Sequence, residues 1–141
     1  MNKKVNKQSN FHKGKHFELF VKQYFKRKEP TWNLCNQKIM TGFYSDRERE
    51  FDLVDKEKKI LIECKYMTFT ANGNNPSAKI SNFLTDIFKL YIAPKEYRKI
   101  ICINKSMSKS KNITLCQHIR KNYSDFLPKN IEIIELTQNS I

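Results

Sequence analysis

Two acidic residues and a lysine interrupt apolar stretches in the middle of the chain. Asp52 lies within EFDLVD (50–55), and Glu63 and Lys65 lie within KILIECKYM (59–67). Both stretches are rich in β-branched and aromatic residues and are separated by a short charged turn, which predicts a β-hairpin. Residues two apart in a strand share a face, so the Glu63 and Lys65 side chains are expected on the same side. Asp52, on the facing strand, is expected to join them there.

These three residue types favour a particular chemistry. Carboxylates in an apolar wall need a partner, because burying an unpaired charge is costly. Two close carboxylates suit a hard divalent cation, and Mg²⁺ keeps several of its waters when bound. An adjacent ammonium, that of Lys65, can orient or help to deprotonate a water, or offset charge on a phosphate. Asp52 and Glu63 are therefore candidate metal ligands for phosphodiester hydrolysis, although a half-exposed hairpin with an ordinary Glu63–Lys65 salt bridge also explains the pattern.

The rest of the chain must supply the elements that position this hairpin. The patterns of apolar residues predict, in order, a helix over 16–28, a strand over 31–40, the hairpin strands, a helix over 80–91, a strand over 99–104, a helix over 113–127 and a strand over 131–136. The hairpin requires antiparallel pairing, while late apolar strands that alternate with helices imply parallel crossovers. The predicted fold class is α/β, with a mixed sheet flanked by helices.

Length and charge limit the remaining possibilities. The 141 residues fit one domain, which we place at 13–141, after a basic N-terminal arm at 1–12. No apolar run is long enough to cross a membrane, and the four cysteines lack metal-ligand spacing, so we expect reduced core thiols in a cytoplasmic protein. A net charge of +13 favours nucleic acid as a partner over a membrane surface.

The segment EFDLVDKEKKILIECKY resembles the core of the PD-(D/E)XK, or restriction-endonuclease-like, nuclease superfamily. Asp52 matches the aspartate of that motif, and Glu63, Cys64 and Lys65 match its E-x-K. The predicted order of elements matches the αβββαβαβ core of the superfamily over residues 13–136. The sequence departs from the motif at one position, where Phe51 stands in place of the proline that many members carry.

The resemblance implies roles for further residues. Many members carry a glutamate on the first helix that aids the metal or its water, and Glu18 matches it, although a carboxylate near a helix start is also favoured by the helix dipole. The backbone carbonyl of Cys64 is implied as a metal ligand, with the sulfur facing the core. Mg²⁺ is the implied cofactor, and Mn²⁺ is expected to substitute for it. The run over 82–90 is similar to the helix that follows the catalytic strand in restriction-type members.

The resulting expectation is a Mg²⁺-dependent DNA endonuclease that cleaves duplex DNA at specific sites, as restriction or homing enzymes do. A structure-specific Holliday junction resolvase and a non-catalytic nucleic-acid-binding module are the alternatives. Because two strands must be cut and each chain offers one site, a homodimer or higher homo-oligomer is expected. Five basic residues flank the site in sequence and are expected to neutralise phosphates without reading bases. They are Lys13, Lys15, Arg47, Arg49 and Lys79.

Overall fold

The chain forms three helices and five strands in the computed structural model, which describes residues 2–138, with side chains from residue 11 onward. The elements are α1 (Asn2–Lys28), β1 (Cys35–Thr41), β2 (Arg47–Asp55), β3 (Ile60–Lys65), α2 (Ser77–Tyr91), β4 (Arg98–Asn104), α3 (Leu115–Asn122), the short 3-10 helix η1 (Ser124–Phe126) and β5 (Ile131–Leu136). The order of helices and strands is the one that the sequence predicts.

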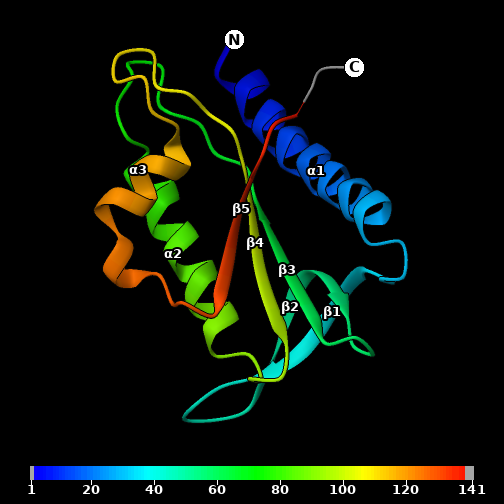
Figure 1. Cartoon of the computed structure of the whole chain (residues 1–141). Helices are drawn as coiled ribbons and strands as arrows, with labels where there is room; N and C mark the ends of the chain where they lie inside the picture. Colours follow the sequence, from blue (N-terminus) through cyan, green and yellow to red (C-terminus); the bar gives the residue numbers. More distant parts are fainter. Residues whose placement is uncertain (1, 139–141) are drawn as a thin grey trace.

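The strands form one mixed sheet in the order β1-β2-β3-β4-β5. Strands β1, β2 and β3 pair antiparallel, whereas β3, β4 and β5 pair parallel. Helix α1 covers one face of the sheet, and α2 and α3 cover the other (Figure 1). The predicted α/β class with a mixed, helix-flanked sheet is confirmed.

The core is divided by the sheet into two apolar clusters. Phe17, Val21 and Phe25 of α1 are buried against one face, as their spacing predicts. The other cluster contains the apolar stripe of α2 (80–90). Strand β4 contributes to both clusters through alternate residues, which is why its sequence is almost uniformly apolar.

Several predicted boundaries are wrong, among them the start of β1, which is Cys35 rather than Thr31, and the start of α2, which is Ser77 rather than Ile80. Helix α1 begins at Asn2 rather than His16, because the polar residues before His16 continue the helix without an apolar stripe to reveal it. Strand β2 begins at Arg47 rather than Glu50, because β1 pairs with this charged segment. Helix α3 ends at Asn122, and a 3-10 turn replaces its predicted last turn. In addition, Cys35 is exposed and is not a core thiol.

One lysine is fully enclosed by the fold. Lys99 on β4 is 1% exposed, and its Nζ donates hydrogen bonds to the carbonyl oxygens of Ala93 (2.8 Å) and Tyr91 (3.2 Å). These carbonyls belong to the end of α2 and the turn after it, so Lys99 satisfies acceptors that the helix leaves free. Burial lowers the pKa of the Lys99 ammonium. Among the described residues, no helix is both long enough and apolar enough to cross a bilayer.

Candidate active site

Strands β2 and β3 separate at the residues that were predicted to carry the chemistry, Asp52 and Glu63. The backbone pairing between β2 and β3 runs from Asp55 opposite Ile60 to Leu53 opposite Ile62. Beyond that point β2 continues along β1, while the last residues of β3 pair with β4. The amide groups at the point of separation have lost their usual partners and must find others.

The carboxylates of Asp52 and Glu63 take the place of the missing backbone partners. The backbone N–H of Cys64 donates to Asp52 Oδ2 at 2.8 Å, and the backbone N–H of Asp52 donates to Glu63 Oε1 at 3.0 Å. Each strand thus donates an amide hydrogen to an acidic side chain of the other. The crossed pair holds both carboxylates at the point where the strands separate.

This placement is electrostatically unfavourable for the carboxylates. Burial raises the pKa of Asp52 to about 6, and the negative charge of Glu18 adds to the shift, while the Cys64 amide opposes it. Burial also raises the pKa of Glu63 to about 7, with the charge of Asp52 as the next cause and Lys89 in opposition. The negative charge of Glu18 thus opposes the ionisation of Asp52, and that of Asp52 opposes the ionisation of Glu63, which is a common property of functional sites.

Two charged residues of α2 complete the site, and sequence reasoning placed neither of them there. Lys89 Nζ lies 3.1 Å from Glu63 Oε2 and donates to the Glu50 carbonyl at 2.7 Å. Asp86 Oδ2 lies 3.3 Å from Lys65 Nζ. Asp86 and Lys89 are three residues apart, and both border the apolar stripe of α2. An acid and a base beside that stripe are the sequence signal that could have indicated their place in the site.

Lys65 lies on the predicted side of the sheet. Glu63 and Lys65 both have their ion-pair partners on α2, so their side chains share a face as the strand period requires. The partner of Lys65, however, is Asp86 rather than one of the hairpin carboxylates. Cys64 packs on the opposite side, with the α1 cluster, which is where its sulfur was expected. Burial raises the pKa of the Cys64 thiol.

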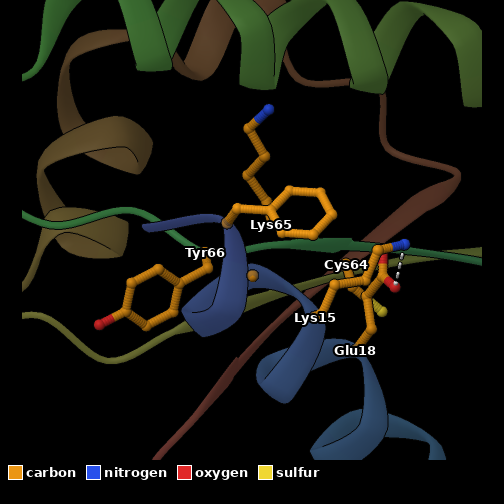
Figure 2. A pocket seen from close by; sticks show the side chains of 7 residues that line it. Lys15, Glu18, Cys64, Lys65 and Tyr66 are labelled. Atoms are coloured by element: carbon orange, nitrogen blue, oxygen red, sulfur yellow. Dashed lines mark hydrogen bonds and ion pairs between the residues drawn. The ribbon is translucent and has the colours of Figure 1, made fainter. Parts of the chain in front are cut away.

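A cavity of about 270 Å³ opens beside the hairpin, between α1 and the end of β3. It is lined by Phe11, Gly14, Lys15, Glu18, Cys64, Lys65 and Tyr66. Figure 2 shows the Lys65 side chain extending towards α2, away from Glu18, which lies on α1 next to Lys15. Lys15 Nζ is 3.3 Å from Glu18 Oε2, and both side chains are accessible to solvent. The cavity gives a ligand access to Glu18, Cys64 and Lys65.

The five basic residues expected to bind DNA are not gathered in one place. Lys15 lines the cavity just described, and Lys13 lines a neighbouring one with Tyr66. Arg47 and Arg49 are exposed on the part of β2 that pairs with β1. Lys79 is half-buried in the first turn of α2. Their contact with phosphates stays a prediction.

The donor atoms can be compared with what a metal ion requires. Among the described residues, no group of three or more His, Cys, Asp and Glu side chains is placed so that it could hold a metal ion. Two carboxylates, Asp52 and Glu63, and the Cys64 carbonyl remain as an all-oxygen set, which is the chemistry that Mg²⁺ prefers. A bound cation would relieve the electrostatic repulsion between the carboxylates. The residues present therefore fit Mg²⁺ in type.

Comparison with known proteins places the chain in a family. The family model DUF234, described as archaea bacterial proteins of unknown function, matches residues 1–76. No curated protein and no solved structure matches the chain. The matched range includes Glu18, Asp52, Glu63 and Lys65 but ends before α2. Because the match spans more than half of the 141 residues, the chain belongs to the DUF234 family.

Proposed function

We propose that the protein is a Mg²⁺-dependent endonuclease of the PD-(D/E)XK type that hydrolyses phosphodiester bonds in DNA. The observation that carries the proposal is the crossed pair, in which Asp52 and Glu63 are fixed at the separation of β2 and β3 at a cost in electrostatic energy. A purely structural hairpin needs no carboxylates at this point, because ordinary backbone pairing would satisfy the same amides. The αβββαβαβ order of elements supports the same assignment.

Each residue of the site would have its own role in the reaction. Asp52, Glu63 and the Cys64 carbonyl would hold the cation, which supplies an activated water and offsets negative charge on the phosphate. Lys65, once released from Asp86, can donate a hydrogen bond to a phosphate oxygen or orient the attacking water. Glu18, which borders the cavity, can accept a hydrogen bond from that water. Lys89 balances part of the charge of Glu63.

Cleavage assays test the proposal directly. Supercoiled plasmid and a synthetic four-way junction would each be incubated with the protein and Mg²⁺, Mn²⁺ or a chelator. We expect metal-dependent cleavage that Asp52→Asn and Glu63→Gln abolish. Preference for the junction would identify a resolvase, and preference for the plasmid a site-specific duplex endonuclease. Absence of cleavage of both substrates by the folded wild-type protein would refute the enzyme assignment.

DNA binding gives a second readout that does not depend on chemistry. With a net charge of +13, affinity should fall by about 0.9 log units per neutralised phosphate for each log unit of salt. Asp52→Asn should bind as tightly as the wild type or more tightly, because it removes a negative charge that faces phosphate. DNA binding without cleavage in Mg²⁺ would favour the non-catalytic binding module, and salt-independent association would contradict both.

A further inference from the structure

Three aromatic side chains form an exposed cluster at the C-terminal end of α2. We call Phe43, Phe88 and Tyr91 the aromatic patch. Their ring centroids lie 6.1 to 6.3 Å apart, yet the residues remain 73%, 55% and 46% exposed. Tyr44 and Met40, close by in sequence on the loop and the end of β1, are exposed as well. Clustered apolar side chains of this kind are typical of interaction surfaces.

The backbone of the 42–46 loop supports this outward arrangement. Gly42 has φ of 139°, a conformation that residues with a side chain rarely adopt. A Cβ at this position would lie 2.0 Å from the Ser45 carbonyl oxygen, so the tight turn requires glycine. The turn carries Phe43 to the two rings of α2, where it remains exposed.

Charge distinguishes between possible partners of the patch. Residues 38–50 contain three basic side chains (Lys38, Arg47 and Arg49) and three acidic ones (Asp46, Glu48 and Glu50), so they are neutral. The whole excess of +13 therefore lies elsewhere in the chain. A nucleic acid would be drawn to the basic surfaces instead. For a second copy of a strongly basic chain, a neutral surface is where approach meets least repulsion.

We propose that two copies of the chain associate through the aromatic patch, around a two-fold axis. A two-fold interface brings the same surface of both copies together, so it must be self-complementary. The aromatic rings can pack against their counterparts, and the neutral segment 38–50, which holds Phe43, carries both signs of charge. In this arrangement charged residues of this segment pair with those of the second copy.

Sedimentation velocity over roughly 1–100 µM protein, without metal or DNA, tests the proposal independently of any nuclease activity. We expect a monomer–dimer equilibrium in the wild type. Phe43→Asp and Phe88→Asp should each raise the dimer dissociation constant by at least about thirtyfold, as residues central to interfaces do. Phe126→Asp is the matched control, because Phe126 is 61% exposed and lies outside the patch. It should leave the equilibrium unchanged.

Circular dichroism melting curves establish that each variant is folded, which is expected because all three side chains are exposed. A wild type that stays monomeric at the highest concentration would overturn the proposal. So would dimerisation that neither patch variant weakens. A monomeric wild type whose patch variants lose DNA affinity would assign the rings to nucleic acid instead. Since none of these experiments uses cleavage, failure of the dimer and failure of the endonuclease proposal remain distinguishable.

Discussion

Two aspartates three residues apart on β2 are held in opposite ways. At the closed end of the hairpin, Asp55 is 4% exposed and accepts hydrogen bonds at 2.9 Å from the backbone amides of Asn33 and Lys58. Burial alone would raise the pKa of Asp55, but these amides outweigh it and leave the pKa lowered. At the open end, Asp52 has one such amide, which does not outweigh burial, and the charge of Glu18 adds to burial, so the pKa of Asp52 is raised.

The comparison shows that the charge of Asp55 stabilises the fold, whereas the charge of Asp52 destabilises it. Backbone N–H donors stabilise the ionised form of Asp55, so its charge strengthens the turn that closes the hairpin. The ionised form of Asp52 is only partly satisfied, so the fold would be more stable without its charge. An identical side chain on one strand therefore serves the fold in one place and, in our proposal, the chemistry in the other.

The largest expected effect is on cleavage at the open end. Lys65→Ala should lower the single-turnover rate at saturating Mg²⁺ by about 10² to 10⁴, because it removes the ammonium that acts on water or phosphate. Its melting temperature should change little, since a half-exposed ion pair such as Lys65–Asp86 contributes about 0 to 1 kcal/mol. Asp86→Asn is the matched control and should retain most of the activity. Near-normal cutting by Lys65→Ala would leave the open end without a catalytic role.

Stability should respond at the closed end instead. Asp55→Asn presents an NH₂ group to one of two backbone donors, so we expect a loss of about 2 to 3 kcal/mol in the free energy of unfolding. Asp52→Asn keeps an oxygen for the Cys64 amide and relieves repulsion, so it should be neutral or stabilising at pH 7.5. Urea denaturation without metal measures both. Equal losses in the two variants would remove the distinction drawn above.

The pH dependence should differ in sign between the two aspartates. Folded Asp52 holds its proton up to about pH 6, whereas the unfolded chain releases it near the ordinary value of 3.8. Wild-type stability relative to Asp52→Asn should therefore fall by about 3 kcal/mol as the pH rises through this interval. Asp55 has a lowered pKa, so its contribution is present above the ordinary value and is lost only as the pH falls below it. Urea titrations from pH 3 to 8 on both variants give the two profiles.

The smallest effect concerns the balance of charge at Glu63. Lys89 occupies Glu63 Oε2, so a cation must compete with the ammonium for this carboxylate. At pH 8, Lys89→Met should bind Mg²⁺ about three to ten times more tightly than the wild type, because it removes a positive charge beside the ligands. Calorimetric titration measures the affinity, with the exposed Lys38→Met as control. Weaker binding by Lys89→Met would indicate that Lys89 organises the carboxylates rather than competing for them.

Much of the fold follows from periodicity, and much of the site does not. The buried stripes of α1 and α2 and the apolar β4 are predictable because burial repeats along them. The polar first half of α1 has no such repeat, so its helical continuation could not be predicted. The charged start of β2 is a strand because β1 pairs with it, and that partner is not visible in local residue types.

The candidate site divides in the same way. The strand period put Glu63 and Lys65 on one face, and the hairpin brought Asp52 opposite them. The exchange of amide donors between the strands depends on where the pairing ends, which no spacing reveals. The ion pairs with Asp86 and Lys89 arise from the docking of α2 on the sheet, so they become visible only in three dimensions.

The enclosed Lys99 makes the protein suitable for chemical footprinting. Lys99 is 1% exposed and its amine donates to two carbonyls, so an amine-reactive reagent can reach it only when β4 and the end of α2 separate. Exposed lysines such as Lys13 and Lys56 should be modified at once and give an internal reference. The rate at which mass spectrometry detects modified Lys99 then reports the opening of the core in the native protein, without denaturant or an introduced probe.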